Sequence, residues 1–238
     1  KFLKEILGND YLASEFFDRQ FLLAVDPSNP FNSAWLSKWL LNLSNDLMDY
    51  LWTTRISKSY SSFSMQFIKR IKRNYNSMND VQLELALNQL IWLLSSVNRN
   101  IRDRSTKLIS LILVKQPDLT ILILNKFSKV TDYYVRERLY AGVFGATVKL
   151  EDNSLIEKIT FIVYKEIFDQ QDVVPHILLR DYARQIIEFA ISKNLCVSIA
   201  QEKIKPPYNS PWYEFTFSND DVDKFSILYC KPLFMLYL

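Results

Sequence analysis

The scarcity of glycine constrains the fold of this chain more than any other feature of its sequence. Only three glycines, Gly8, Gly142 and Gly145, occur among 238 residues. Tight turns in β-proteins and loops that bind phosphate groups need glycine, because its backbone enters conformations that other residues avoid. A chain with so little glycine is therefore expected to be helical. The hydrophobic content of 49% also excludes a disordered chain, because it suffices for a packed core.

Apolar residues recur at the spacing of an amphipathic helix along most of the chain, and the alternation typical of strands is rare. Short polar or proline-containing links separate these stretches, as at 26–30. Helices of this length with short links pack as antiparallel neighbours. We expect helices at 10–25, 33–42, 44–56, 61–75, 80–96, 100–115, 117–128, 134–150, 153–168, 175–193 and 198–203, and one more beginning at 220.

Three ten-residue segments, at 100–109, 134–143 and 178–187, align with one another without gaps. Each contains an aliphatic residue, then arginine, then an acidic residue, and a second aliphatic residue eight positions after the first. The three arginines lie 34 and 44 residues apart, which is a period expected of helical repeat proteins. Because another predicted helix precedes each segment, the repeating unit is a pair of helices.

The second copy, Asp132-Tyr-Tyr-Val-Arg136, resembles the Asp-x-x-Val-Arg pattern that opens the second helix of a HEAT repeat. The first copy, Asn98-Arg-Asn-Ile-Arg102, is a weaker match with asparagine as the cap, and in the third copy Pro175 precedes the helix. The resemblance implies that the aliphatic residue faces the partner helix and that the arginine reaches the next repeat. Four residues would then form a structural ladder between repeats: Arg102, Arg136, Arg180 and Asp132.

These patterns predict an all-α fold in which antiparallel helix pairs stack as a short, HEAT-like, right-handed solenoid. Residues 1–79 are expected to form N-terminal helix pairs without the signature, and residues 80–205 the HEAT-like repeats. Residues 206–238 are expected to form an irregular C-terminal segment, whose apolar end at 225–238 either packs on the body or frays.

A second, longer-range resemblance concerns the runs 134–141, 179–184 and 205–212. Together they are similar to the helical C-terminal regions of large bacterial STAND-type NTPases, some of which act in antiviral defence. In that family the helical array senses a protein partner, while a separate domain binds nucleotide. The resemblance implies a sensor or scaffold module of a larger protein. No Gly-x-x-x-x-Gly-Lys-Ser/Thr motif occurs in this sequence, so no ATPase activity is implied.

The residue types that usually carry catalysis are sparse. His176 is the sole histidine and stands in no metal-ligand spacing, so we expect it to serve the first turn of a helix. Cys196 and Cys230 lack neighbouring activating groups, which favours buried structural thiols in a reducing cytoplasm. No apolar stretch approaches the ~20 residues of a membrane span. We therefore expect a cytoplasmic, non-enzymatic chain without metal, cofactor or membrane partner.

Two groups of residues are candidates for binding a partner. Trp35, Trp39 and Trp52 form either part of the core or, if exposed, a protein-binding cluster, because aromatic anchors dominate interfaces. The window 50–79 contains no acidic residue, and four basic residues crowd its predicted helix end: Lys69, Arg70, Lys72 and Arg73. Such a group either contacts nucleic-acid phosphates or forms a solvated helix end.

The net charge of +3 is too small to indicate nucleic acid by itself. We therefore expect protein binding as the function, and the alternative is a nucleic-acid-binding HEAT-like module similar to HEAT-like DNA glycosylases. A continuous positive groove would favour nucleic acid, whereas mixed charge with exposed aromatic residues would favour protein. Gly142 and Gly145 lie inside a predicted helix and indicate that two helices approach closely there.

Overall fold

The computed structural model describes residues 9–58, 63–196, 198–210 and 218. Across these residues the protein is all-helical and contains no strand, as the sequence predicts. The elements are α2 (Asp10–Leu23), α3 (Ser33–Leu40), α4 (Asn45–Met48), the π-helical turn η1 (Asp49–Thr53), α5 (Thr54–Lys58), α6 (Phe63–Asn74), the short turn η2 (Tyr75–Ser77), α7 (Asp80–Trp92), the short turn η3 (Leu93–Ser95), α8 (Arg99–Lys115), α9 (Leu119–Phe127), α10 (Tyr133–Thr147), α11 (Asn153–Ile167) and α12 (Ile177–Ser192).

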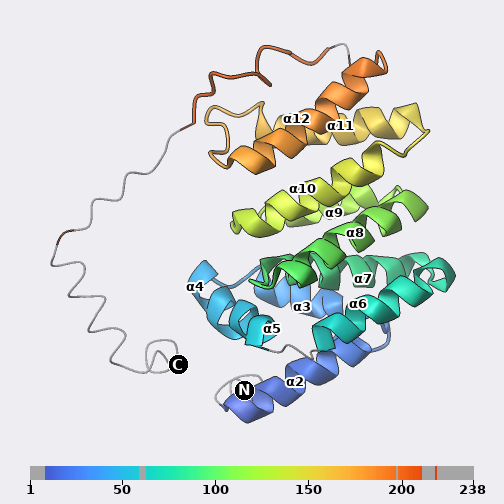
Figure 1. Ribbon diagram of the computed structural model, residues 1–238, viewed down its shortest axis with the longest axis vertical. Helices are drawn as coiled ribbons and strands as arrows, with labels where there is room; N and C mark the ends of the chain where they lie inside the picture. The colour runs from blue at the N-terminus through green and yellow to red at the C-terminus, as the bar shows by residue number, and fades with distance from the viewer. Residues whose placement is uncertain (1–8, 59–62, 197, 211–217, 219–238) are drawn as a thin grey trace.

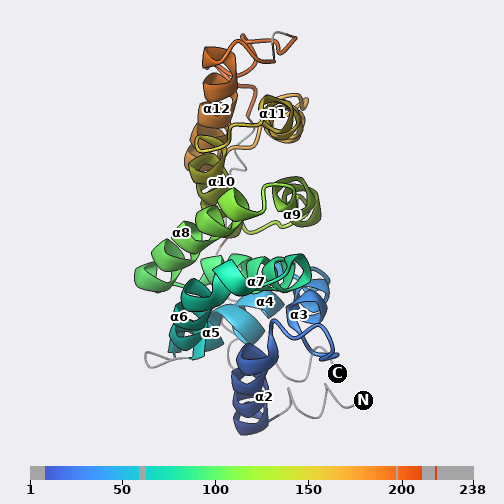
Figure 2. The same cartoon turned by 90° about the vertical axis from the view of Figure 1, so that its right-hand side faces the viewer.

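The helices lie in two rows that run along the long axis of the molecule (Figures 1 and 2). In one row α6, α8, α10 and α12 contact one another in turn, and in the other α3, α7, α9 and α11 do so. Contacts of α7 with α8 and of α11 with α12 join the rows. The N-terminal α2 packs on α6 at the far end from α12. The three aligned segments therefore belong to α8, α10 and α12, which are consecutive helices of one row.

Polar N-cap side chains fix where most of the helices begin, because they accept hydrogen bonds from backbone N–H groups that the first turn leaves unpaired. Asn79 and Gln82 form a reciprocal capping box at the start of α7. The other caps are Asn9, Asn32, Ser44, Asn98, Asp132, Asp152 and His176. The cap at Asn98 is present as expected, and His176 serves the first turn of α12, which also agrees with the expectation from the sequence.

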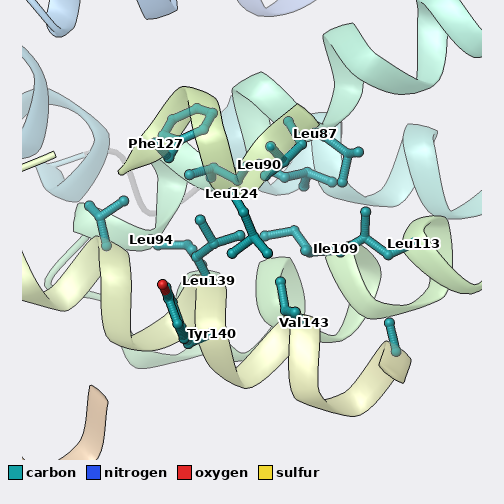
Figure 3. Close-up of a cluster of buried hydrophobic side chains, with 14 of the residues drawn as sticks. Leu87, Leu90, Leu94, Ile109, Leu113, Leu124, Phe127, Leu139, Tyr140 and Val143 are labelled. Carbon is teal, nitrogen blue, oxygen red and sulfur yellow. The ribbon is translucent and has the colours of Figure 1, made fainter. Parts of the chain in front are cut away.

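A continuous apolar core fills the space between the two rows. Figure 3 shows its middle, where side chains of α7, α8, α9 and α10 meet. Leu87, Leu90, Ile109 and Val143 are completely buried there. The buried apolar residues of successive helices thus belong to one cluster that extends along the molecule.

Some expectations from the sequence are wrong or fall on other parts of the chain. Residues 198–203 form turns rather than the expected helix. The helix expected at 44–56 is present from Asn45 to Lys58, with the π-helical segment η1 in its middle. Of the C-terminal segment 206–238, only residues 206–210 and 218 are described. Outside the described residues therefore lie the apolar stretch 225–238, the helix expected at 220, Trp212 and Cys230. Gly8, near the other end of the chain, is also outside them.

The two helical glycines both face α8. A Cβ atom added to Gly142 would lie 3.0 Å from the Cγ2 atom of Ile109 and 3.4 Å from the carbonyl oxygen of Thr106. At Gly145 the nearest atom would be the hydroxyl of Ser110, also at 3.0 Å, which can rotate away. The absence of a side chain at Gly142 thus allows α10 to approach α8 closely, in agreement with the expectation from the sequence.

The aligned arginines occupy the same position, the fourth residue of α8, α10 and α12. Arg102 donates to the carbonyl of Ser96, and Arg180 donates to that of Val174, in the link before its own helix. Each guanidinium also contacts a later segment. Arg102 lies over the ring of Tyr134 at 5.8 Å, and Arg180 over that of Tyr208 at 4.7 Å.

Arg136 makes the strongest of these forward contacts. Its Nη2 atom donates to Glu166 Oε1 on α11 at 2.7 Å, and the side chains are only 11% and 16% exposed. The phenol of Tyr140 is buried beside them. Burial raises the pKa of Tyr140 well above its ordinary value, and the negative charge of Glu166 adds to this effect. Arg136 and Glu166 are largely buried, so the charge of each is balanced by the charge of the other.

We predict that Gly142→Leu and Gly145→Ala change stability in different ways. Gly142→Leu should lower the free energy of unfolding by about 1–3 kcal/mol, because the new side chain overpacks a rigid contact with α8. Gly145→Ala should be neutral or raise it by up to about 1 kcal/mol, because alanine favours the helix and Ser110 can move. Urea denaturation followed by circular dichroism measures both values. Equal losses for the two variants would contradict this account of the interface.

We predict that Arg136→Ala lowers the free energy of unfolding by about 3 kcal/mol, because it leaves Glu166 buried without its countercharge. The double variant Arg136→Met/Glu166→Leu should lose less, since it removes both charges and keeps apolar volume. The same denaturation measurement compares the three proteins. A single variant as stable as the wild type would show that the ion pair does not hold α10 to α11.

Candidate functional site

An open pocket of about 890 Å³ lies between the α4–η1–α5 segment and the N-terminal ends of α8, α10 and α12. A second hollow of about 320 Å³ continues over Pro175, Ile177 and Leu178. Tyr133 and His176 line both hollows, so the two adjoin each other at this pair of side chains. We call them together the helix-end groove and define it by Asp49, Val97, residues 132–134 and residues 175–178.

The repeat itself builds this groove. In α10 and α12 the third helical residue, Val135 or Leu179, is completely buried against the core. The two residues before it then point away from the core. Tyr133 and Tyr134 are 38% and 60% exposed, and Ile177 and Leu178 are 64% and 50% exposed. An exposed apolar strip therefore follows from the register of the caps.

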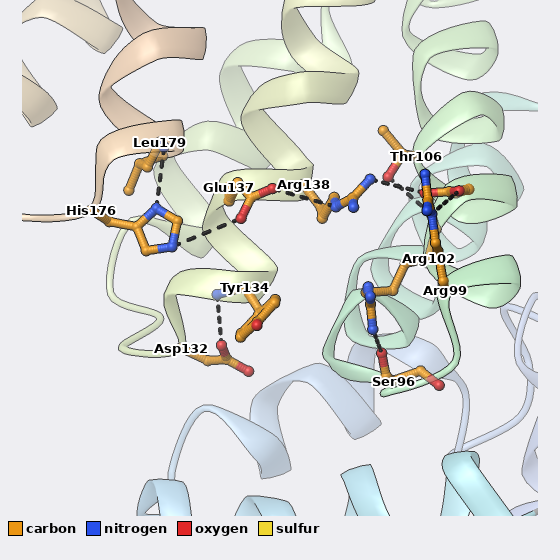
Figure 4. A network of polar contacts seen from close by, with 11 residues as sticks. Ser96, Arg99, Arg102, Thr106, Asp132, Tyr134, Glu137, Arg138, His176 and Leu179 are labelled. Atoms are coloured by element: carbon orange, nitrogen blue, oxygen red, sulfur yellow. Dashed lines mark hydrogen bonds and ion pairs between the residues drawn. The ribbon is translucent and has the colours of Figure 1, made fainter.

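Contacts between neighbouring helix ends place these residues side by side. The ring centroids of Tyr133 and His176 are 5.6 Å apart. Arg102 at the start of α8 contacts the ring of Tyr134, and Val97 before α8 is 72% exposed at the edge of the pocket. Figure 4 shows Asp132, Tyr134 and His176 together above the α4–α5 region. The strip is thus one surface rather than scattered apolar side chains, which are common on any protein.

The charge of the groove is negative. Asp49 and Asp132 are the charged residues among its described lining, which contains no lysine or arginine. The carboxylate of Asp132 accepts a hydrogen bond from the Tyr134 N–H at 2.8 Å. Burial raises the pKa of Asp132, its backbone hydrogen bonds lower it, and the nearby groups Asp49 and His176 raise and lower it, respectively. In the described part of the chain, neither carboxylate forms an ion pair.

His176 is held by both of its ring nitrogens. Nδ1 accepts a hydrogen bond from the Leu179 N–H at 3.3 Å, which requires this nitrogen to carry no proton. Nε2 lies 3.8 Å from Glu137 Oε2. The histidine therefore caps α12 and connects it to α10. This arrangement agrees with the structural role expected from the sequence and leaves neither nitrogen directed at a substrate.

A chain of alternating charges runs beside the groove across α8, α10 and α12 (Figure 4). Asp103 accepts from Arg99 at 3.3 Å and from Arg138 at 3.0 Å. Arg138 is also 3.5 Å from Glu137, which in turn faces His176. Arg99 and Arg138 are thus paired with carboxylates of the same molecule, whereas Arg102 donates to a backbone carbonyl and lies over the ring of Tyr134.

The tryptophans predicted to bind a partner lie elsewhere. Trp52 is completely buried, and its Nε1 donates to the carbonyl of Trp92 at 2.9 Å, so it belongs to the core and cannot anchor a partner. Trp35 and Trp39 are half-buried and stack on each other, with ring centroids 6.0 Å apart. Phe16 packs edge-on against Trp35, so this pair is part of an aromatic cluster between α2 and α3.

The predicted basic group is only partly available to a ligand. Arg70 donates to the carbonyls of Phe21 and Leu22, at 2.7 and 2.8 Å, and thereby caps the C-terminal end of α2. Lys69, Lys72 and Arg73 are exposed on α6. None of the four lines the helix-end groove.

Other chemical features are limited in the described residues. Cys196 is half-buried rather than buried as expected, and burial, followed by the charge of Glu157, raises the pKa of its thiol. Over the described ranges, no three His, Cys, Asp or Glu side chains are grouped so that they could hold a metal ion. In the same ranges, no helix is both long enough and apolar enough to span a membrane.

The sequence contained a signal for the groove that our sequence analysis missed. The starts of α10 and α12 each carry three consecutive aromatic or aliphatic residues, Tyr133-Tyr134-Val135 and Ile177-Leu178-Leu179. A helix with one buried stripe cannot turn three consecutive residues inward, because successive side chains point about 100° apart. Surplus apolar residues directly after a cap therefore indicate an exposed strip. Asp49 gave no such signal, since only tertiary packing brings it to α10.

We predict that the variants Asp132→Asn and Asp132→Ala distinguish the contribution of the helix cap to stability from the contribution of its charge. Asp132→Ala should lower the free energy of unfolding by about 1 kcal/mol, because it removes the cap, whereas asparagine caps as well as aspartate. The raised pKa of Asp132 means that the folded state disfavours its charged form. Relative to Asp132→Asn, the wild type should be most stable below the ordinary pKa of 3.8 and lose this advantage as the pH rises. Denaturation of the three proteins at pH 3, 5 and 7 measures these free energies of unfolding. A wild type whose stability relative to Asp132→Asn increases with rising pH would contradict the prediction.

Comparison with protein-family models, with curated proteins and with solved structures finds no match for this chain.

Proposed function

We propose that this chain is a non-catalytic protein-binding module that docks a partner in the helix-end groove. The observation that carries the proposal is the group of exposed aromatic and aliphatic residues that line two adjoining hollows, namely Tyr133, Tyr134, Ile177 and Leu178. Exposed apolar residues grouped around a hollow are typical of protein interfaces, where a few aromatic anchors supply most of the binding free energy.

The distribution of charge favours a protein over a nucleic acid. Ion pairs neutralise Arg99 and Arg138 beside the groove, and the groove itself contains Asp49 and Asp132. Phosphate groups would be repelled by such a surface. The nucleic-acid alternative depends on three exposed residues of α6, namely Lys69, Lys72 and Arg73, because Arg70 already binds backbone carbonyls.

As the fold of this module we propose antiparallel helix pairs stacked in a short, HEAT-like, right-handed solenoid. Support comes from the equivalent positions of Arg102, Arg136 and Arg180, each four residues after an N-cap. The contacts of α8 with α10 and of α10 with α12 also fit stacked repeats. A role as the cytoplasmic sensor part of a larger STAND-like protein in antiviral defence is the biological setting we propose, and it rests on the sequence resemblance.

We predict that substitutions in the groove abolish partner binding without unfolding the chain. The immobilised wild-type chain and the double variant Tyr134→Asp/Leu178→Asp are incubated with cell lysate, and the retained proteins are quantified by mass spectrometry. Leu122→Asp is the control, because Leu122 is 40% exposed on α9 and lies outside the groove. At least one protein retained by the wild type and the control should fall about tenfold or more with the groove variant, since loss of a hot spot costs at least about 2 kcal/mol.

Two results would overturn the proposal. One is an identical set of retained proteins for the wild type and the groove variant, with circular dichroism showing that both are folded. The other is submicromolar binding to DNA or RNA that weakens steeply between 50 and 200 mM salt, by about 10³–10⁵ for six to ten phosphate contacts, and is lost in Lys69→Gln/Lys72→Gln/Arg73→Gln.

A further inference from the structure

We propose that the occupant of the helix-end groove is a protein segment in which a lysine or arginine side chain is flanked by apolar residues. This inference rests on the proposed function and specifies the chemistry of the partner. The basic side chain would bind between the carboxylates of Asp49 and Asp132, and the flanking residues would pack on Val97 to one side and on Ile177 and Leu178 to the other.

Charge complementarity selects a cationic occupant. The groove brings two carboxylates together without a lysine or arginine in its described lining. Asp49 is exposed, whereas Asp132 is half-buried at the cap of α10. The mutual repulsion of the two charges, which contributes to the raised pKa of Asp132, is relieved when a cation binds between them. A basic side chain therefore gains more here than at an isolated surface carboxylate.

The aromatic walls suit an organic cation better than a metal ion. Tyr133 and Tyr134 directly follow Asp132 in the sequence, and the ring of Tyr133 offers a lysine or arginine a cation–π contact. The molecule already uses this chemistry, because the guanidinium of Arg102 lies 5.8 Å from the ring centroid of Tyr134. Calcium requires six to eight oxygen ligands, which two carboxylates do not provide. In the described residues no third metal-binding side chain joins them.

The apolar parts of the groove require more than a free cation. The hollow of about 320 Å³ over Pro175, Ile177 and Leu178 contains no carboxylate. It adjoins the acidic pocket at Tyr133 and His176, which line both hollows. An occupant that fills both hollows must present a charge at one point and apolar groups beside it. A short protein segment with one basic residue between apolar residues has this pattern.

The test selects ligands without assuming a partner. A phage-displayed library of random twelve-residue peptides is selected on the whole chain, and the enriched peptides are synthesised with a fluorescent label. Their dissociation constants are measured by fluorescence polarisation for the wild type and for Asp49→Asn/Asp132→Asn. Asparagine keeps the cap of α10 while removing its charge. The matched control is Asp152→Asn, which makes the same change at the cap of α11, outside the groove.

We expect the enriched peptides to share a lysine or arginine next to apolar residues. Affinity should fall about tenfold or more in Asp49→Asn/Asp132→Asn, because charge-assisted hydrogen bonds are removed, and should be unchanged in Asp152→Asn. Replacing the basic residue of the peptide by glutamine should cause a similar loss. Affinity should also fall with rising salt, because part of the binding is electrostatic.

The contrary results separate this inference from the proposed function. Peptides without a basic residue that bind the wild type, and are lost in Tyr134→Asp/Leu178→Asp, would overturn the inference and leave the protein-binding function standing. Peptides that bind Asp49→Asn/Asp132→Asn as tightly as the wild type would overturn it in the same way. A selection that yields no peptide, or only peptides that also bind the groove variant, would overturn both.

Discussion

The close contact between α8 and α10 is the constraint on which the rest of the structure depends. Gly142 faces Ile109 and the backbone of Thr106, so even a methyl group at this position would be crowded. Because α10 also packs on α12, its position relative to α8 determines how the whole row is spaced. The buried ion pair of Arg136 and Glu166 then fixes α10 to the second row through α11. Contacts with α8, α12 and α11 thus hold α10, and these contacts also position the ends of the neighbouring helices relative to it.

Successive residues in the first turns of α10 and α12 have different roles. In α10, Asp132 caps the helix, Tyr133 and Tyr134 face outward, Val135 enters the core and Arg136 contacts Glu166 on α11. The same order in α12 gives a cap, two exposed apolar residues, a buried leucine and a forward-reaching arginine. Stacking such turns side by side aligns the outward residues into a strip. The register that stabilises the stack thus also produces the candidate binding surface.

Electrostatics distinguishes the groove from the surface beside it. Asp103 and Glu137 take up the charges of Arg99 and Arg138, and these ion pairs are satisfied inside the molecule. Asp132 accepts a hydrogen bond at the cap of α10 and forms no ion pair with a lysine or arginine among the described residues. The tethering of Arg70 to the end of α2 removes one cation from the group that most suggested nucleic acid. The positions of paired charges, rather than their numbers, therefore define the binding properties.

The sequence by itself determined the all-helical fold and most helix positions, because glycine scarcity, helical periodicity and polar caps act locally. It also indicated that Arg102, Arg136 and Arg180 occupy equivalent positions, because each lies in a short segment that aligns with the other two without gaps. Tertiary structure alone decided that Trp52 is buried and that Asp49 lines the same pocket as Asp132. Both facts depend on how α4 and η1 pack against helices far along the chain. Local patterns specify helices, whereas the composition of a groove between them is set by packing between residues distant in sequence.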